Sequence, residues 1–331
     1  MTIMKIGKTL VAAAAVLAMS AVSAYAEKTV IRISTPAVPG DWHAEQLSVF
    51  KEYVERSLPG QYDVQIYLNA TLFKQGAEPA QMKRGNLDMA MISAQDIAKQ
   101  LPQYSIFTAG YLIQSPAHQQ AVFYGEVGDE YFGAVSKKMD VQILAVGYLG
   151  TRQLNLRDVR DVKTPADLKG VKLRMPGSKA WQFLGSALGV SPTPLAFNEV
   201  YLSLKTGAID GQDNPLPTDQ KAKFYEVTKQ IVLTSHLVDG VFLTIANKAW
   251  NKMNAEQKAV FTEGARLAAE FNNNNRVRDE AKLVDFFKAE GMTITTPDVD
   301  AFRKHVQAEY LKSEFSKTWP KGLLERINAA K

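Results

Sequence analysis

Residues 164–217 give the clearest prediction of the fold class, and they read TPADLKGVKLRMPGSKAWQFLGSALGVSPTPLAFNEVYLSLKTGAIDGQDNPLP. Short strands and helices with clear start and stop signals alternate in it: a helix start at Thr164-Pro165, a strand over 171–174, a helix over 179–188, a helix over 199–206 capped by Asn198, and a strand over 208–210. Glycines follow both longer helices, as is common at helix ends. This rhythm predicts a mostly parallel sheet with covering helices.

Arg174 ends the first of these strands, directly before the turn Met175-Pro176-Gly177-Ser178. At the C-terminal edge of a parallel sheet, that position points into the crevice where α/β proteins bind ligands. A guanidinium group matches a carboxylate with two parallel hydrogen bonds. The alternative is an exposed arginine in a surface salt bridge, and position alone supports the two equally.

Asn214 belongs to a second polar segment, Asp210–Pro215, which is expected to be a loop after the short strand over 208–210. An asparagine there can donate to a carboxylate oxygen while it accepts from a neighbour. Asp-Gly and Asn-Pro also favour ordinary turns. Without further information, the turn is the better interpretation.

The same alternation extends outward in both directions. Further strands are expected over 29–34, 62–68, 88–92, 141–146 and 241–246, and further helices over 43–58 and 78–84. Residues 255–290 contain no proline and predict one very long helix or two helices end to end. Its weak point is Asn272–Asn275, because asparagine has poor helix propensity, and a kink or a solvated turn is expected there.

The first 26 residues have the order of a secretory signal peptide. Lys5 and Lys8 precede an apolar stretch over 9–19, and Ala24-Tyr25-Ala26 supplies small residues for cleavage after Ala26. The apolar stretch is too short to span a bilayer, and no later segment is long and apolar enough. We therefore expect an exported periplasmic protein without a stable membrane anchor; a buried N-terminal helix is the alternative.

Composition narrows the class of protein. Removing 26 residues from 331 leaves 305, enough for about two domains. Lys5 and Lys8 leave with the signal, so 37 basic and 34 acidic side chains remain, which is no footprint for nucleic acid. The chain has no cysteine, which excludes a lipid-modified N-terminal cysteine and any thiolate nucleophile or thiolate metal site.

Signatures of catalysis are absent from the sequence. It contains no G-x-S-x-G elbow, no G-x-x-x-x-G-K-[ST] loop and no G-x-G-x-x-G. The four histidines, His43, His118, His236 and His305, lie far apart, and none forms an H-x-x-x-H pair. We expect no enzyme activity, no cofactor and no metal site.

Four linked motifs in 164–217 resemble the solute-binding subunits of tripartite ATP-independent periplasmic (TRAP) transporters, the DctP-type family. They are, in the family's order and spacing, Lys172-Leu173-Arg174-Met175-Pro176, Pro192-Thr193-Pro194-Leu195, Glu199-Val200-Tyr201 and Gly207-Ala208-Ile209-Asp210-Gly211-Gln212-Asp213-Asn214-Pro215. The similarity continues outward through Thr151-Arg152-Gln153, Leu72-Phe73-Lys74-Gln75-Gly76 and Gly85-Asn86-Leu87-Asp88-Met89. It covers essentially the whole chain after the signal peptide.

The resemblance implies an α/β fold of two lobes, similar to type II periplasmic binding proteins. Crossing strands and a long interlobe helix would join the lobes, which close on a ligand in the cleft. Residues 27–150 with about 239–279 would form lobe I, and residues 151–238 with about 280–331 would form lobe II.

The resemblance also implies a set of ligand-binding residues. Arg174 matches the arginine that forms the salt bridge to the substrate carboxylate, and Asn214 matches the residue that hydrogen-bonds the same group. Arg152 matches a second basic residue of the cleft, and Phe197 a residue that packs beside the ligand. On the first lobe, Gln75 and Ser93 match positions that select the ligand. Further cleft candidates, although such residues more often lie in the core or at the rim, are Trp42, Trp181, Tyr111 and His236.

The function implied is capture of a small carboxylate by a monomer and its delivery to the small and large membrane subunits of the transporter. One alternative is a periplasmic enzyme acting on organic acids, such as a lyase. Another is a binding protein that serves an ATP-driven importer or a sensor kinase. The ligand stays open among C4-dicarboxylates, keto acids, sugar acids and aromatic acids.

Overall fold

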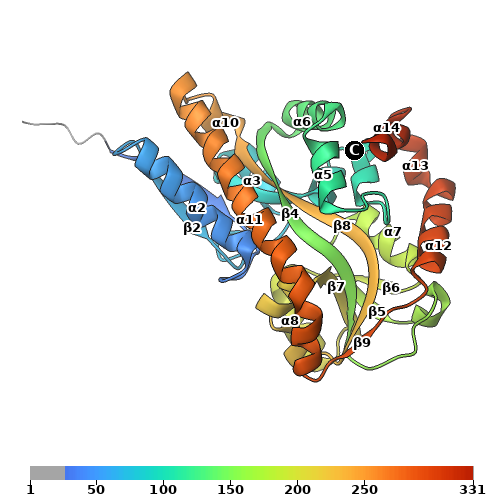
Figure 1. The fold of residues 1–331 in the computed structure, drawn as a ribbon. Helices are drawn as coiled ribbons and strands as arrows, with labels where there is room; N and C mark the ends of the chain where they lie inside the picture. The colour runs from blue at the N-terminus through green and yellow to red at the C-terminus, as the bar shows by residue number, and fades with distance from the viewer. Residues whose placement is uncertain (1–26, 331) are drawn as a thin grey trace, which may run out of the picture.

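A computed structural model describes residues 27–330, and the expected signal peptide lies outside these residues. Within them, one mixed sheet runs in the order β2-β1-β3-β8-β4-β7-β5-β6, and β9 pairs with β8 (Figure 1). The strands are β1 Thr29–Ser34, β2 Tyr62–Tyr67, β3 Met89–Ser93, β4 Val141–Leu156, β5 Lys172–Met175, β6 Ser191–Pro194, β7 Gly211–Pro215, β8 Gln230–Ala246 and β9 Thr293–Thr295.

The sheet is parallel at its two ends and antiparallel in the middle. β2, β1 and β3 run parallel, as do β7, β5 and β6, whereas β8 pairs antiparallel with β3 and β4, and β4 pairs antiparallel with β7. The predicted mostly parallel sheet is therefore right for the ends only. The two central strands extend from one end group to the other (Figure 1).

The helices cover both faces of this sheet (Figure 1). The α-helices are α2 Trp42–Ser57, α3 Glu78–Arg84, α4 Ala94–Ala98, α5 Pro116–Phe123, α6 Glu126–Met139, α7 Lys179–Ala187, α8 Val200–Thr206, α9 Leu216–Lys221, α10 Asn247–Trp250, α11 Ala255–Ala289, α12 Val299–Lys312, α13 Glu314–Thr318 and α14 Leu323–Ala329. The 3-10 helices are η1 Pro102–Thr108, η2 Pro165–Leu168, η3 Phe197–Glu199 and η4 Phe224–Glu226. None of the helices between residues 27 and 330 combines the length and apolarity needed to cross a bilayer.

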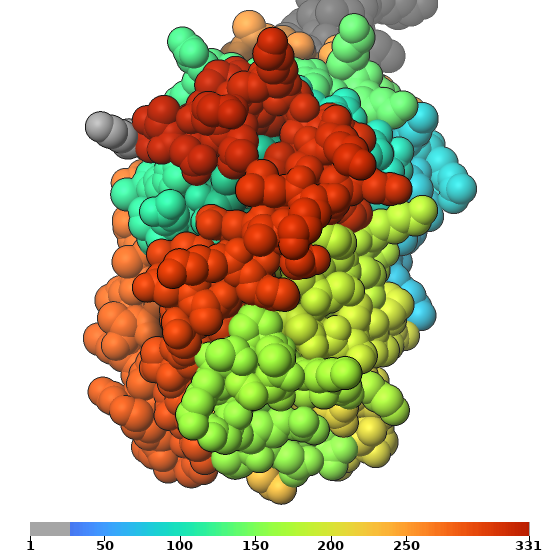
Figure 2. All heavy atoms as spheres, turned by 90° about the vertical axis from the view of Figure 1, so that its right-hand side faces the viewer, coloured from blue at the N-terminus to red at the C-terminus, as the bar shows by residue number. Residues whose placement is uncertain are grey.

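Strand β3 shows why helices must lie on both sides. Its residues alternate between two cores: Met89 and Met91 pack in a core with α2 and the first half of α11, whereas Ala90 and Ile92 pack in a larger core with α4, η1, α5 and α6. A strand buried on both faces reads as a continuous apolar run rather than an alternating one. The larger core continues under the C-terminal helices α12 and α14, which cover the upper part of one face of the molecule (Figure 2).

The long helix α11 is continuous over 35 residues, so the expected break at the asparagine run does not occur. Asn272 is fully buried and donates its amide to the carbonyl of Tyr148 in β4, 2.9 Å away. The backbone N–H of Tyr148 in turn donates to Oδ1 of Asn273 at 2.6 Å. The two asparagines therefore join the helix to a central strand, which offsets their poor helix propensity.

The two-lobed α/β fold is confirmed. The predicted lobe boundaries at residues 150, 238 and 279 fall inside β4, β8 and α11, which are the three elements that extend along both halves of the molecule. The assignment of the individual segments to the two lobes stays a prediction.

Candidate functional site

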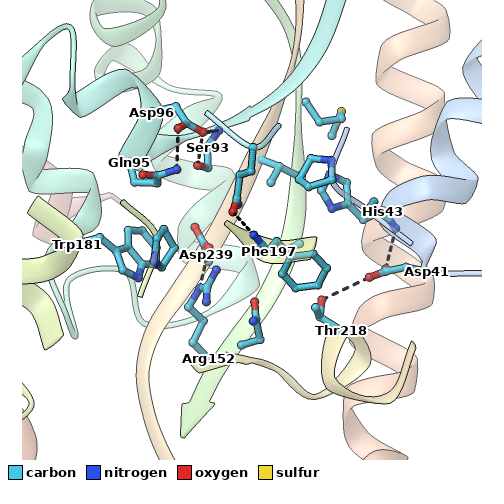
Figure 3. A pocket seen from close by; sticks show the side chains of 18 of the residues that line it. Asp41, His43, Ser93, Gln95, Asp96, Arg152, Trp181, Phe197, Thr218 and Asp239 are labelled. Atoms are coloured by element: carbon cyan, nitrogen blue, oxygen red, sulfur yellow. Dashed lines mark hydrogen bonds and ion pairs between the residues drawn. The ribbon is translucent and has the colours of Figure 1, made fainter. Parts of the chain in front are cut away.

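A cavity lies where the C-terminal ends of strands from both parallel groups meet. β3 contributes Ser93 and the segment after β1 contributes Pro36 from one group, while β5 contributes Arg174 and β7 contributes Asn214 from the other (Figure 3). The space between its walls, including the part open to solvent, is about 670 Å³. Sheets of α/β proteins bind ligands at this edge.

Arg174 is buried in the wall without an acidic partner. It is 1% exposed. Its Nε donates to the carbonyl of Leu195 and its Nη2 to Oε1 of Gln75, both at 2.9 Å. No carboxylate of residues 27–330 lies within 4.0 Å of its guanidinium. Burial lowers the pKa of Arg174 to about 9, because Asp213 only partly offsets the loss of solvent and the charge of Arg152. The surface salt bridge considered as an alternative is therefore wrong.

Asn214 lies beside Arg174 on a strand rather than on a loop. The segment expected to be a polar loop forms β7, and residues 208–210 form no strand. The strand is possible in this polar sequence because β4 and β5 hydrogen-bond it from both sides. β4 approaches closely enough that a Cβ on its Gly150 would meet Pro215 at 2.4 Å. Asn214 lines the cavity and donates its amide to Oε1 of Gln212 at 2.6 Å.

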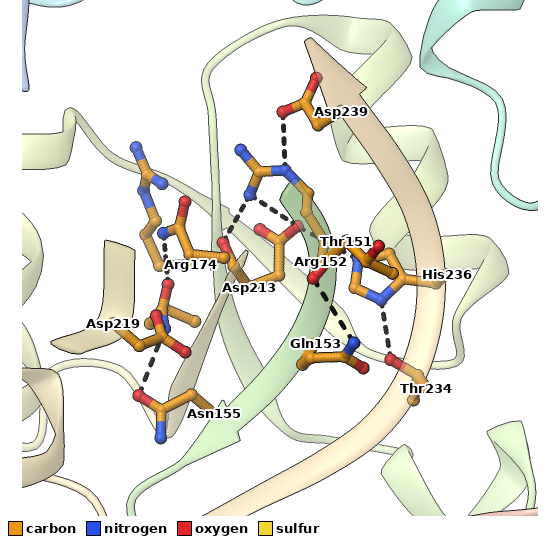
Figure 4. A network of polar contacts seen from close by, with 12 residues as sticks. Thr151, Arg152, Gln153, Asn155, Arg174, Asp213, Asp219, Thr234, His236 and Asp239 are labelled. Carbon is orange, nitrogen blue, oxygen red and sulfur yellow. Dashed lines mark hydrogen bonds and ion pairs between the residues drawn. The ribbon is translucent and has the colours of Figure 1, made fainter. Parts of the chain in front are cut away.

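Arg152 also lines the cavity, but two carboxylates neutralise it (Figure 4). Its Nε donates to Asp239 at 2.8 Å and its Nη1 to the side chain of Asp213 at 3.1 Å. Burial alone would lower the pKa of Arg152, and the two aspartates outweigh it and raise the pKa instead. The guanidinium lies 4.8 Å from the ring centre of Trp181, a cation–π distance. The charge of Arg152 is therefore paired within the protein, and these ion pairs fix one wall of the cavity.

Four polar atoms in the lining are buried and have no hydrogen-bond partner among the described residues. They are Nε2 of His43, Oε1 of Glu78, Oε1 of Gln95 and Nε1 of Trp181. Buried polar atoms are nearly always paired, so these four atoms are left for partners other than the described residues. Burial lowers the pKa of His43 to about 4 and raises the pKa of Glu78 to about 8, so both side chains are largely neutral at pH 7.

Asp41 is held on the far side of the cavity from Trp181 (Figure 3). It caps α2 by accepting from the backbone N–H of His43 at 3.0 Å, and it forms an ion pair with Arg276 of α11. Its other oxygen accepts from the hydroxyl of Thr218 in α9 at 3.4 Å. The carboxylate of Asp41 is therefore paired, and it joins the N-terminal helix to the second half of the chain.

The structure brings seven of the ten predicted site residues to this cavity: Arg174, Asn214, Arg152, Phe197, Gln75, Ser93 and Trp181. Gln75 connects the two walls of the cavity, because its Oε1 accepts both from Arg174 of β5 at 2.9 Å and from the backbone N–H of Phe197 in η3 at 3.0 Å.

The other three predicted residues lie elsewhere. Trp42 packs on Phe271 of α11 and donates its indole N–H to Asp279 at 2.5 Å. The hydroxyl of Tyr111 donates to the carbonyl of Thr234 at 2.9 Å. His236 is fully buried behind the wall, between Asp213 and Thr234 (Figure 4). Each has its polar atoms occupied by the protein, so none lines the cavity.

Sequence reasoning missed several lining residues, among them Asp41, His43, Glu78, Gln95 and Asp239. The strand-end rule that selected Arg174 also indicates the segments after β1 and β3, and it could have found the first two and Gln95. Asp239 lies in the middle of β8, where nothing in the sequence distinguishes it.

Comparison with known proteins gives a match to the family described as bacterial extracellular solute-binding protein, family 7 (DctP), over residues 33–317. The sialic acid-binding periplasmic protein SiaP of Vibrio cholerae is 29% identical over 296 residues, which cover 89% of this chain and 92% of SiaP.

Crystal structures of two TRAP periplasmic solute-binding proteins from Roseobacter denitrificans are also similar. One, with bound 3-deoxy-D-manno-oct-2-ulosonic acid, is 44% identical and has a TM-score of 0.89, covering 92% of this chain and 100% of that one. The other, with bound L-galactonate, is 26% identical and has a TM-score of 0.84, covering 92% and 99%.

Proposed function

Because the chain belongs to the bacterial extracellular solute-binding proteins of family 7, the DctP-type binding subunits of TRAP transporters, we propose that it captures a small organic acid in the cavity and delivers it to a transporter in the membrane. Delivery would require a small and a large membrane subunit. The protein would act as a monomer in the periplasm after cleavage of residues 1–26.

The observation that carries this proposal is the buried guanidinium of Arg174, which contacts a carbonyl and an amide oxygen but no carboxylate. A buried cation without a partner costs several kcal/mol, and a carboxylate at bidentate distance removes that cost. Asn214, held by Gln212, would donate to the same carboxylate with its second amide hydrogen. Phe197, whose ring centre lies 5.9 Å from the guanidinium, would pack beside it.

The four unpartnered polar atoms support a ligand with polar groups besides its carboxylate. His43, Glu78, Gln95 and Trp181 line the cavity, and each has a donor or acceptor atom without a partner among the described residues. The relatives named above bind 3-deoxy-D-manno-oct-2-ulosonic acid, L-galactonate and sialic acid, all of which combine a carboxylate with hydroxyl groups. We extend this class of ligand to the chain as a proposal.

Binding would favour the closed arrangement of the two halves. Gln75, next to α3, already accepts from Arg174 of β5 across the cavity, and Lys74 lies 3.5 Å from Glu199. A ligand carboxylate that pairs with Arg174 only when both walls surround it would shift the population toward closure. No chemical step is required for this function.

The test is a thermal-shift screen of organic acids followed by calorimetry on wild type, Arg174→Ala and Arg174→Lys. We expect Arg174→Ala to weaken binding at least about thirtyfold, a loss of about 2 kcal/mol, and Arg174→Lys to recover little of it. The control is Arg56→Ala, since the side chain of Arg56 is exposed on α2. Unchanged affinity in Arg174→Ala would show that the ligand is held elsewhere.

Recovery of the ligand separates a binding protein from an enzyme. After incubation with a stoichiometric amount of protein for several hours, the acid should be recovered unchanged. Conversion of the acid to a product would instead favour the periplasmic enzyme. Uptake that depends on an ATPase subunit would favour the ATP-driven importer.

A further inference from the structure

Among the described residues that line the cavity, one cation has no carboxylate within ion-pair distance. Arg152 forms ion pairs with both Asp213 and Asp239. Asp41 is paired with Arg276, and Asp96 lies 3.2 Å from Nζ of Lys99. Arg174 alone remains as a cation without a carboxylate partner. One free cation can neutralise one ligand carboxylate.

The wall formed by α3 and α4 offers neutral polar atoms and no free cation. Glu78 is 2% exposed; its Oε2 accepts from the backbone N–H of Gly76 at 2.7 Å, and its Oε1 has no partner. Gln95 also lines the cavity and is equally buried; Asp96 accepts from its amide nitrogen at 2.6 Å, and its Oε1 has no partner. These neighbours fix which atom each side chain presents.

Hydroxyl groups fit this wall, and a carboxylate does not. A hydroxyl both donates and accepts, so it can donate to Oε1 of Gln95 and exchange a hydrogen bond with Glu78. An ionised carboxylate accepts only, and it would be buried here without a cation. The environment already resists negative charge: burial, with Asp96 nearby, raises the pKa of Glu78.

We propose that the cavity selects monoanions, binding one carboxylate at Arg174 and hydroxyl groups at Glu78 and Gln95, and that it rejects acids carrying a second carboxylate. This inference rests on the proposed function and narrows it. It removes C4-dicarboxylates from the ligand classes that the sequence left open. The wall of α3 and α4 would determine that acids with one carboxylate bind more tightly than acids with two.

The experiment compares acids that differ in one group. Calorimetry is run with galactonate against galactarate and with erythronate against meso-tartrate, so that a terminal hydroxymethyl group is replaced by a carboxylate on the same carbon skeleton. Succinate and malate represent the C4-dicarboxylates. We expect wild type to bind the monoacid of a pair at least tenfold more tightly than the diacid.

Two substitutions at Gln95 test the wall. Gln95→Met removes the acceptor at similar volume and should weaken monoacid binding at least fivefold without weakening the diacid. Gln95→Lys adds a cation to this wall and should strengthen diacid binding. The ratio of monoacid to diacid affinity should fall at least tenfold. Gln100→Met is the matched control, because Gln100 is exposed just after α4, and it should change neither affinity.

The outcomes separate this inference from the function on which it rests. Diacids that bind wild type as tightly as monoacids, or a ratio that Gln95→Lys leaves unchanged, would overturn the selection of monoanions. If acids bind to wild type and Arg174→Ala abolishes this binding, the proposed function holds even where the selection of monoanions fails. Failure of every acid to bind would overturn the proposed function itself.

Discussion

At the scale of single residues, Arg152 and Arg174 are both buried arginines of one cavity with opposite surroundings. Arg152 contacts two carboxylates and its pKa is raised, whereas Arg174 contacts a carbonyl and an amide oxygen and its pKa is lowered. Arg152 therefore stabilises the fold through ion pairs within the protein. Arg174 can pair with an anion that the protein does not supply.

This difference predicts opposite effects of matched substitutions on stability. Arg152→Met should lower the free energy of unfolding of the ligand-free protein by about 3–5 kcal/mol, because it leaves Asp213 and Asp239 buried without their partner. Arg174→Met should cost less than about 1 kcal/mol or stabilise, since two lost hydrogen bonds are offset by removal of an unpaired charge. Urea unfolding measures both. Equal destabilisation by the two variants would show that both arginines contribute alike to the stability of the ligand-free protein.

Glu78 predicts a pH dependence of stability. Its pKa rises from an ordinary value of 4.5 to about 8 in the folded protein. Between these values the folded state keeps a proton that the unfolded chain has lost, so this group lowers stability as pH rises through the window. Glu78→Gln lacks the effect, and its stability relative to wild type should increase by more than about 1 kcal/mol between pH 5 and pH 8.

Urea unfolding at the two pH values checks this prediction, with Glu263→Gln as the control because the carboxyl of Glu263 is exposed on α11. A difference between Glu78→Gln and wild type that stays constant with pH would show that Glu78 is ionised in the folded protein.

Sequence could predict individual site residues only where a motif or a strand end indicated them. Arg174 and Asn214 belong to linked motifs, and both line the cavity. The sequence does not indicate that Arg152 pairs with Asp239, because 87 residues separate them along the chain. Glu78 stands at the start of α3 and reads as an ordinary helix-terminal acid, and its burial depends on tertiary packing.

At the level of elements, the bounds of the predicted helices match better than those of the central strands, although the sequence analysis predicts no helix at α5, α6, α12 or α14. Helix α3 begins and ends as predicted, and α11 within one residue, whereas β4 and β8 are 16 and 17 residues long and only six residues of each were predicted. Gly147 and Gly150 interrupt the apolar pattern of β4, and its pairing with β8 shifts register in three places. Such irregularities are set by the partner strand, which the local pattern does not contain.

The seam between α11 and β4 gives a prediction at this scale. Asn272→Ala should lower the free energy of unfolding by about 1–3 kcal/mol, because it leaves the buried carbonyl of Tyr148 without its side-chain donor. Asn274→Ala, two residues further along the helix, is the control. Asn274 is exposed and alanine is the better helix former, so the free energy of unfolding should stay equal or rise slightly. Urea unfolding compares them, and equal effects would contradict a role of Asn272 in fastening the helix.

At the scale of the whole molecule, contacts from distant parts of the chain close the cavity. Gln75 meets Arg174, Lys74 meets Glu199, and Asp41 meets Arg276 and Thr218. The first two pairs join the wall next to α3 to β5 and η3. Because surface ion pairs such as Lys74–Glu199 contribute little, closure depends on what is bound between the walls. An acid that satisfies Arg174 would supply the larger part of that free energy.

A crystal structure of the protein with its bound acid would test whether Arg174 binds the carboxylate. We expect a ligand carboxylate with two N···O distances of about 2.7–2.9 Å to the guanidinium of Arg174, with the amide of Asn214 donating to the same group. A ligand held elsewhere in the molecule, with the side chain of Arg174 turned to solvent, would contradict it.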